Sequence, residues 1–267
     1  DFSPDVDDTA VVGMALDRAD SSANDDALRR AAHWVIGMQS KNGGWGSFDV
    51  DNTHYYLNHI PFADHGALLD PPTADVSARC LSFLAQAGYD KDHPVLKAAV
   101  AYLRAEQEDD GSWFGRWGTN YVYGTWSVLS ALNANGIPPE DEAVRKAVAW
   151  LTLQQRADGG WGEDGATYWH EHKGLAKTST PTQTSWALLA LMAAGETDSD
   201  AVRNGIEYLM DAPHADGKWD EKHYNAVGFP KVFYLMYHGY PVYFPLWALA
   251  RYRRLRDGNA KTTSFGM

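Results

Sequence analysis

The sequence predicts an all-α protein of helical hairpins, the architecture that closes into an α/α toroid. Two observations predict this class: a motif that recurs in three complete copies, and apolar helices that lie between the copies. We see no convincing alternation of apolar and polar residues, so we expect no β-strand. The predicted helices make four hairpins and a C-terminal helix, so a toroid of the six-hairpin α/α-barrel type is incomplete here.

Each copy of the motif reads as a helix that ends in a tight turn. Its core is Gln-x-x-x-Gly-x-Trp, with Gln at 39, 107 and 155, and an Ala and an aromatic residue precede it at helical spacing. Gly permits positive φ in the turn, Trp packs back over it, and Gln can tie the helix end to the next repeat. A fourth copy keeps Gly217 and Trp219 but has Pro213 at the Gln position. We therefore assign Trp45, Trp113, Trp161 and Trp219 a structural role.

Further apolar helices with many small residues alternate with the repeat helices. They are predicted over residues 9–18, 74–88, 121–136 and 182–195. A long non-repetitive segment, residues 48–72, interrupts this order. Because loops of that length inside a packed fold are usually functional, we expect this segment to contribute to the site.

Composition excludes several functions. The 23 basic and 35 acidic residues give a net charge of −12, which argues against nucleic acid as a partner. The single cysteine, Cys80, excludes an internal disulfide and a zinc site built from several cysteines. The apolar stretches are far too short to span a membrane. The 11 Trp, 14 Tyr and 9 Phe are more aromatic residues than folding requires, which indicates a use for flat, π-rich surface.

Three carboxylates stand within four residues at Asp5-Val6-Asp7-Asp8, directly before an apolar helix. Helix capping explains one or two of them, and calcium binding lacks a suitable ligand loop. The third interpretation is acid catalysis. Crowded carboxylates cannot all ionise, so one proton is retained. A retained proton beside an apolar cavity is what an alkene-protonating acid needs.

Several motifs together resemble the class II triterpene cyclases, most closely the squalene–hopene branch. They are DVDDTA at 5–10, the repeated Gln-x-x-x-Gly-x-Trp turns, TWSV at 125–128 and TPTQTSWALLAL at 180–191. Asp-x-Asp-Asp is the version found in squalene-cyclising members, and the Cys-containing acid motif of oxidosqualene cyclases is absent. The resemblance covers essentially the whole chain and matches the C-terminal half of the family. It implies that residues 1–267 are the C-terminal catalytic α/α-barrel domain of a longer enzyme, without its upstream half and second barrel.

The resemblance also implies roles for individual acidic residues. Asp7 would be the proton donor, with Asp5 and Asp8 as its partners, and Asp75 would be a further carboxylate of the site. Arg79 matches a position that is His in some members. Arginine can hold Asp anions through an i,i+4 geometry but cannot relay a proton.

The same resemblance implies a role for the aromatic residues, because cyclisation passes through carbocations that π-faces stabilise. The positions that match the family's pocket are Phe48, Trp117, Tyr123, Phe229, Phe233, Tyr237 and Tyr240. The spacing of four between Phe229, Phe233 and Tyr237 lets them share one helical face. Phe62 and Ala63 resemble the constriction of the substrate channel.

The implied reaction is acid-initiated polycyclisation of squalene, a C30 polyene, to hopene or hopanol. It ends in deprotonation or capture of water. No cofactor and no metal are expected, because the driving acid is a side chain. The resemblance implies a monotopic enzyme on the cytoplasmic side of the bacterial inner membrane, and the sequence leaves a homodimer open. We expect the chain by itself to be inactive and to expose apolar surface.

Two other functions stay open at the level of the residues. Trp platforms and paired carboxylates also suit a carbohydrate-active α/α toroid, although three adjacent Asp fit glycoside chemistry poorly. A non-catalytic helical scaffold would use the aromatic residues for packing only.

Overall fold

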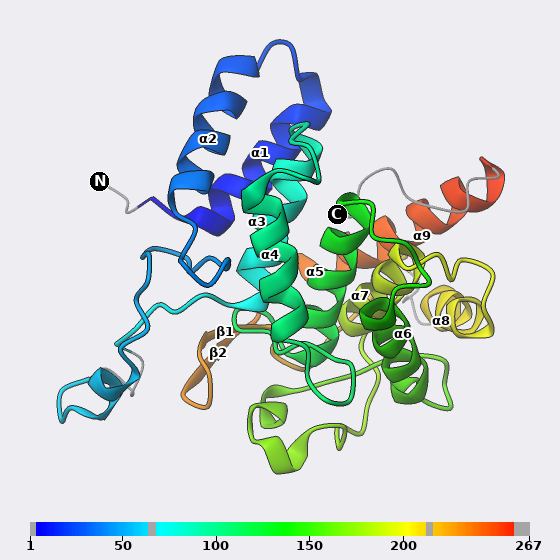
Figure 1. The fold of residues 1–267 in the computed structure, drawn as a ribbon. Coiled ribbons are helices and arrows are strands. Elements are labelled where there is room, and N and C mark those ends of the chain that lie inside the picture. The colour runs from blue at the N-terminus through cyan, green and yellow to red at the C-terminus, as the bar shows by residue number, and fades with distance from the viewer. Residues whose placement is uncertain (1–3, 64–67, 212–215, 259–267) are drawn as a thin grey trace.

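A computed structural model describes residues 4–63, 68–211 and 216–258 of the chain. These residues form four helical hairpins and a C-terminal helix, which confirms the predicted all-α class (Figure 1). The helices are α1 (Val6–Asp20), α2 (Asp25–Gly37), α3 (Ala74–Gln86), α4 (Pro94–Ala105), α5 (Tyr121–Ala134), α6 (Glu142–Gln154), α7 (Pro181–Ala193), α8 (Asp200–Asp211) and α9 (Tyr240–Asp257). Short 3-10 turns are η1 (Tyr55–His59), η3 (Gly165–Tyr168) and η4 (His170–His172).

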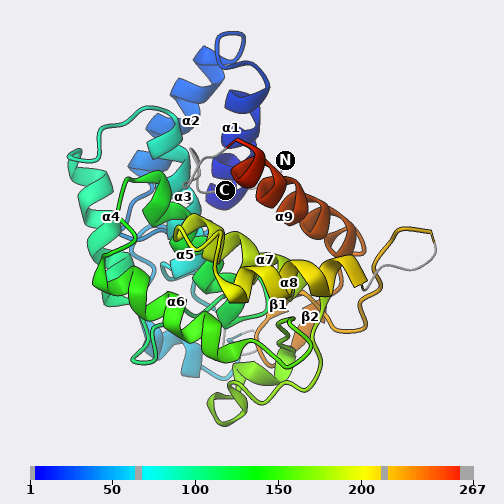
Figure 2. The same cartoon turned by 90° about the vertical axis from the view of Figure 1, so that its right-hand side faces the viewer.

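The helices form an inner and an outer row (Figure 2). Helices α1, α3, α5, α7 and α9 pack in that order as the inner row, and α2, α4, α6 and α8 cover them from outside. Every residue of α7 is buried, as is α5 from Tyr121 to Leu132, because these sequences are apolar or small on all sides. The outer helices bury one stripe only. Among the helices of the described residues, none has the length and hydropathy of a membrane span.

The repeated turns have the predicted structure. The indole nitrogen of each turn Trp donates to a carbonyl ten residues earlier, as Trp161 does to the Leu151 carbonyl at 2.7 Å. The same bond occurs at Trp45, Trp113 and Trp219. The Gly residues preceding these Trp by two positions all have positive φ, and the first three lie against the next outer helix. An added Cβ at Gly159 would stand 2.5 Å from the Asn204 carbonyl oxygen.

The repeat glutamines tie successive hairpins together, as the sequence predicts. Gln155 Nε2 donates to the Gly159 carbonyl of its own turn and to the Ala201 carbonyl at the start of α8, both at 2.8 Å. Gln39 and Gln107 make the equivalent pair of bonds. Position 213, where the fourth copy has Pro, lies outside the described residues.

Two short strands correct the expectation that the chain has none. Strand β1 (Ala226–Phe229) pairs antiparallel with β2 (Phe233–Leu235). Lys231, with φ 69°, lies in the turn between them, and the amide of Val227 donates to the Trp117 carbonyl at 3.0 Å. The strands are too short to show alternation, and they form because a distant turn completes their hydrogen bonding. Phe229 and Phe233 therefore face each other across a hairpin, not along a helix.

Residues 48–72 form the predicted long loop. Its described part contains only η1, and Figure 1 shows it projecting away from the helices beside the β-hairpin. Its return limb is anchored by Asp70, whose carboxylate accepts from the backbone amides of Ser47, Phe48 and Asp49. The base of the loop is therefore held against the turn that contains Trp45.

Candidate active site

The acidic motif lies at the N-terminus of α1, where the amino ends of the inner helices meet. Asp5 is the N-cap, and its side chain accepts from the Asp8 amide at 3.0 Å. Capping thus explains Asp5, and burial is the main reason that its pKa is raised. Asp8 is exposed and lines the groove between α1 and α2. The third carboxylate, Asp7, points elsewhere.

Asp7 is paired with a buried arginine of the neighbouring inner helix. Nη1 of Arg79 on α3 donates to both carboxylate oxygens of Asp7, at 3.0 and 2.9 Å. Nη2 of the same guanidinium donates to the Tyr123 hydroxyl on α5. Asp7 is 22% exposed at its side chain and Arg79 only 10%. Three inner helices therefore converge on one ion pair.

The surroundings raise the pKa of Asp7 to about 6. Burial is the largest cause, Arg79 opposes it, and the charge of Asp75 adds to it. Asp5 contributes least among the causes. Crowding within the motif, the sequence-based explanation, is therefore minor compared with desolvation. The result is a carboxylic acid that keeps part of its proton near neutral pH.

Arg79 keeps its charge under all relevant conditions. Burial works against the charged guanidinium, but Asp7, Tyr123 and Asp75 outweigh it and hold the pKa of Arg79 well above its ordinary value. The Tyr123 ring also lies under the guanidinium, with 5.1 Å from Cζ to the ring centroid. Burial raises the pKa of Tyr123, so its hydroxyl stays protonated.

Asp75 is fully buried in the first turn of α3. Its Oδ2 accepts from the backbone amides of Arg116 and Trp117 at 3.0 and 2.9 Å, and its Oδ1 has no hydrogen-bond partner within the described residues. The expected i,i+4 contact from Arg79 to Asp75 is therefore wrong. Arg79 turns to the Asp7 carboxylate across the helix interface, and backbone amides bind one oxygen of Asp75 instead.

Trp117 stands beside this carboxylate and is half-buried. The Arg116 guanidinium lies 4.2 Å from the Trp117 ring centroid. Phe48 meets the same indole edge-on, with 6.4 Å between centroids. The structure thus brings together two predicted pocket residues that are far apart in the sequence.

Tyr123, Tyr240 and Tyr237 belong to a second aromatic group, connected through Trp186. The Trp186 ring lies 5.0 Å from Tyr123 and 6.1 Å from Tyr240, and Tyr237 stacks on Tyr240 at 4.9 Å. Phe244 extends the group along α9. A continuous series of aromatic ring contacts, buried at Tyr123 and Trp186, therefore begins at the hydroxyl that touches Arg79.

The remaining predicted residues lie farther out. Phe229 and Phe233 form an edge-to-face pair at 5.4 Å on the β-hairpin, which is bonded to the turn that carries Trp117. Phe62 is 83% exposed on the projecting loop, and Ala63 beside it is half-buried. No described contact connects Phe62 or Ala63 with the acidic residues, so their channel role stays a prediction.

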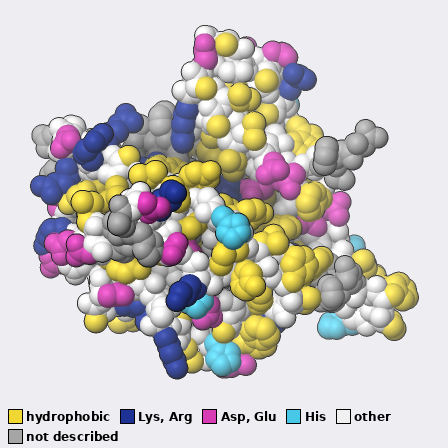
Figure 3. All heavy atoms as spheres, turned by 180° about the vertical axis from the view of Figure 1, so that it is seen from behind, with side chains coloured by type: hydrophobic (Ala, Val, Ile, Leu, Met, Phe, Trp, Pro, Cys, Tyr) yellow, Lys and Arg dark blue, Asp and Glu magenta, His cyan; other side chains and the backbone are white. Residues whose placement is uncertain are grey.

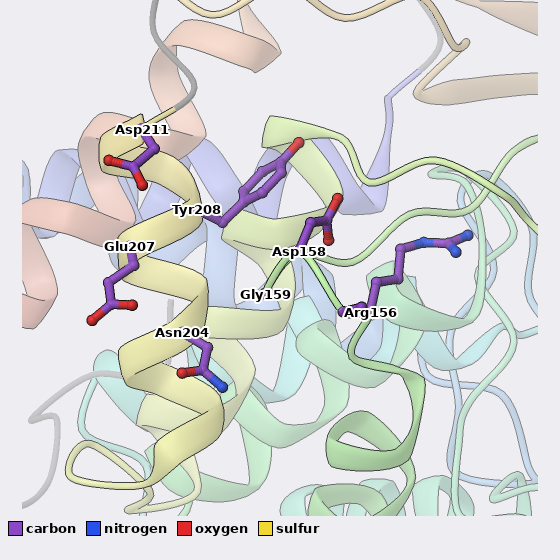
Figure 4. Close-up of a pocket in the computed structure, with 8 residues that line it drawn as sticks. Arg156, Asp158, Gly159, Asn204, Glu207, Tyr208 and Asp211 are labelled. Carbon is purple, nitrogen blue, oxygen red and sulfur yellow. The ribbon is translucent and has the colours of Figure 1, made fainter.

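The surface agrees with this arrangement. Figure 3 shows hydrophobic side chains gathered on one face below the α1–α2 hairpin, with acidic side chains at the base of that hairpin. The most voluminous hollow described, ≈ 500 Å³, lies elsewhere, between α8 and the turn after α6. It is lined by polar residues such as Asp158, Asn204 and Glu207, and no predicted site residue lines it (Figure 4). The acidic residues and the aromatic rings beside them therefore remain the candidate site.

Sequence reasoning missed three residues that support the site. Arg116 covers Trp117, Tyr168 bonds the turn that carries both, and Asn225 holds the backbone of Tyr237 with both atoms of its amide. None of the three belongs to a repeat, and each contacts residues to which no sequence motif relates it. Burial sets Tyr168 and Asn225 apart from other polar residues, and burial is known only from the tertiary structure.

The family model "Squalene-hopene cyclase C-terminal domain" matches residues 1–254. The chain is 58% identical to the squalene–hopene cyclase of Zymomonas mobilis, with 100% of the chain and 42% of that protein covered. It is 52% identical to the enzyme of Alicyclobacillus acidocaldarius, with 95% and 41% covered. The chain thus spans about two fifths of the length of these curated relatives.

Solved structures support the fold. An ent-copalyl diphosphate synthase from Streptomyces platensis superposes with a TM-score of 0.60 at 22% identity, over 96% of this chain and 42% of that one. At this identity the likeness concerns the fold alone, and it agrees with the α/α-toroid class predicted from the repeats. On the family match and the identity of its relatives, the chain belongs to the squalene–hopene cyclase family of class II terpene cyclases.

Proposed function

We propose that this chain forms the proton-donating part of an enzyme that cyclises squalene to hopene and hopanol. The observation that carries the proposal is Asp7, a desolvated carboxylic acid with a pKa of about 6, placed beside a continuous series of aromatic rings. Such an acid retains a proton for an alkene, and the rings suit a cation that migrates away from it.

The proposed reaction uses the residues in sequence. The carboxyl proton of Asp7 passes to a terminal alkene carbon of squalene, and the π electrons of that alkene form the new C–H bond. Arg79, hydrogen-bonded to both oxygens of Asp7, stabilises the carboxylate that remains. Successive alkenes then attack the cationic carbon. The final cation either loses a proton to give hopene, or takes up water, which then loses a proton to give hopanol.

The aromatic side chains would act on the cation. The ring contacts lead from Tyr123, next to Arg79, through Trp186 to Tyr240 and then Tyr237. Trp117 and Phe48 form a separate pair of rings beside Asp75. Negative π-faces attract positive charge most strongly where water is excluded. Phe229 and Phe233 on the hairpin add a further pair of rings.

Attachment to a membrane is also part of the proposal. Squalene is apolar, and the projecting loop exposes Tyr55, Tyr56 and Phe62. We propose that the whole enzyme, including its upstream half and second barrel, works on the cytoplasmic face of the inner membrane and that this chain by itself is inactive. Co-flotation of the whole enzyme with liposomes tests the attachment, and light scattering tests whether it is a dimer.

The test of function is incubation of the enzyme of full family length, ending in this chain, with squalene. We expect cyclic triterpenes in the organic extract by gas chromatography–mass spectrometry, and for Asp7→Asn a loss of at least about 10³-fold in kcat, because the amide donates no proton to an alkene. Asp92→Asn is the control, since Asp92 is an exposed residue paired with Lys97. Absence of cyclic products from the unmodified enzyme, or full activity in Asp7→Asn, would overturn the proposal.

A further inference from the structure

The turn over residues 115–119 connects Trp113 with α5 and closes one side of the acid site. Its amides at Arg116 and Trp117 supply both hydrogen bonds to Asp75 Oδ2. Its carbonyl at Trp117 accepts from Val227 of the β-hairpin, and its amide at Thr119 donates to the Asn225 carbonyl. The geometry of this turn therefore decides whether Asp75 receives its two amide donors.

Tyr168, in η3, reaches this turn from the loop after α6. Its hydroxyl oxygen lies 2.7 Å from the Gly115 carbonyl oxygen and 2.9 Å from the Gly118 carbonyl oxygen. Both carbonyls of the turn are therefore acceptors within reach of the Tyr168 hydroxyl hydrogen. The side chain is buried, and its ring packs edge-on against Phe114 at 5.5 Å. Burial also raises the pKa of Tyr168, so the donor keeps its proton.

The connection from Tyr168 to Asp75 runs through one peptide plane. The carbonyl of Gly115 and the amide of Arg116 belong to the same trans peptide unit, and they point in opposite directions. A hydroxyl that holds the Gly115 carbonyl on one side therefore aims the Arg116 amide at Asp75 on the other. Neither Gly115 nor Gly118 has room for a side chain, since an added Cβ would meet the Asn120 carbonyl or the Tyr123 ring.

We propose that Tyr168 is a positioning residue of the acid site, which aims the amides of the 115–119 turn at Asp75 and so fixes the Asp75 carboxyl group in its place near Asp7. The inference rests on the proposed function, because it assigns Tyr168 to the same proton transfer. Tyr168 is connected to Asp7 only through the turn and Asp75, so it acts by positioning these groups and does not touch the reacting atoms.

The direction of the effect follows from the charges. The two amide hydrogen bonds fix Asp75 in position, and the charge of Asp75 is one of the causes that raise the pKa of Asp7. Without the amides the Asp75 side chain can turn away from Asp7, so it raises the pKa of Asp7 less and Asp7 loses its proton at a lower pH. The titratable or charged groups that act on or with Asp7 are Asp5 on α1, Asp75, Arg79 and Cys80 on α3, Tyr123 on α5 and Tyr240 on α9. Those around Asp75 are Arg79, Tyr102, Arg116, Tyr123 and Tyr168.

The test is Tyr168→Phe in the enzyme of full family length, assayed with squalene across pH. The change keeps the ring packing and removes only the hydroxyl. We expect an about tenfold fall in kcat with unchanged KM, because a lost buried hydrogen bond costs roughly that factor and Tyr168 is placed away from the substrate. We also expect the alkaline limb of the kcat–pH profile to move to lower pH.

Tyr234→Phe is the matched control. Tyr234 packs against Tyr168 at 6.0 Å and donates to the Gly165 carbonyl of the same loop, but no described bond joins it to the 115–119 turn. We expect its kcat to stay within about twofold of the unmodified enzyme and its pH profile to stay unchanged.

A second variant covers the case in which Tyr168→Phe folds poorly. 4-Aminophenylalanine at position 168 keeps an N–H donor at the same place, and we expect it to restore kcat and the pH profile. A normal kcat and profile in Tyr168→Phe would overturn the inference. So would a loss of kcat that is equal at every pH, or one that 4-aminophenylalanine does not restore. If the unmodified enzyme makes no cyclic triterpene, the proposed function itself fails, which is a distinct result.

Discussion

The tryptophans of the repeated turns and the exposed aromatic residues of the candidate site differ in the contacts that hold them. Trp45, Trp113 and Trp161 are completely buried, and the indole nitrogen of each is bonded to a carbonyl ten residues earlier. Phe233 and Tyr237, by contrast, are 43% and 48% exposed, and their described ring contacts are with other aromatic rings. The same residue types thus serve folding where the backbone fixes them, and remain available to a ligand where only rings meet.

The largest expected difference between these regions is in stability. Trp161→Ala should lower the free energy of unfolding by about 3–5 kcal/mol, because it opens a cavity and leaves the Leu151 carbonyl unpaired. Phe233→Ala should cost less than about 1 kcal/mol, since the ring is already half-exposed. Urea denaturation followed by circular dichroism measures both.

Activity should show the reverse order in this pair of variants. On the proposed function, Phe233→Ala changes the product mixture or the yield from squalene, whereas Trp161→Ala loses activity only in proportion to unfolded protein. Equal stability losses in the two variants would break the comparison.

A smaller effect separates the complete repeats from the fourth. Gly159 and Gly217 both have positive φ, at 82° and 78°, but only Gly159 lies against a neighbouring helix. Gly217→Ala should cost about 1 kcal/mol for the backbone conformation alone, and Gly159→Ala about 2 kcal/mol or more, because its Cβ also meets the Asn204 carbonyl. Thermal unfolding of the two variants side by side measures the contribution of the helix contact, and identical melting temperatures would contradict it.

The smallest expected effect is a pH dependence of stability. Glu163 and Glu221 follow Trp161 and Trp219 by two residues and cap α5 and α7, and burial raises the pKa of each to about 7. A raised pKa in the folded state means stability that is complete below pH 4.5 and is lost as pH rises through 7. We expect the unfolding free energy to fall by on the order of 1 kcal/mol between about pH 6.5 and about pH 7.5.

Replacing these two carboxylates tests that origin. The double variant Glu163→Gln, Glu221→Gln keeps an oxygen acceptor at each helix end and removes the titration of both groups. It should flatten most of the profile between about pH 6.5 and about pH 7.5, a window that lies above the pKa of Asp7. Glu142→Gln, at an exposed residue paired with Lys146, is the control. A profile that remains unchanged in the double variant would assign the pH dependence to other groups.

Short-range pattern made much of the fold predictable. The spacing from Gln155 through Gly159 to Trp161 implies a helix end, a turn with positive φ and a returning indole, and each of these is set within about ten residues. The acidic motif was equally predictable, since Asp5 caps the helix whose first turn contains Asp7. The hairpin at 226–235 was not, because its pairing depends on the turn at 117–119, more than a hundred residues away.

The sequence by itself determined the repeat architecture, the family and the position of the acidic motif, because all three depend on residue types at fixed local spacing. Only the tertiary structure decided how the acid is tuned. Arg79 holds Asp7 from 72 residues away, the 115–119 turn holds Asp75 from 41 and 42, and Tyr168 holds that turn from 53 and 50. A pKa is set by desolvation and by charges within a few ångströms, and such proximity follows from packing between helices, not from order along the chain.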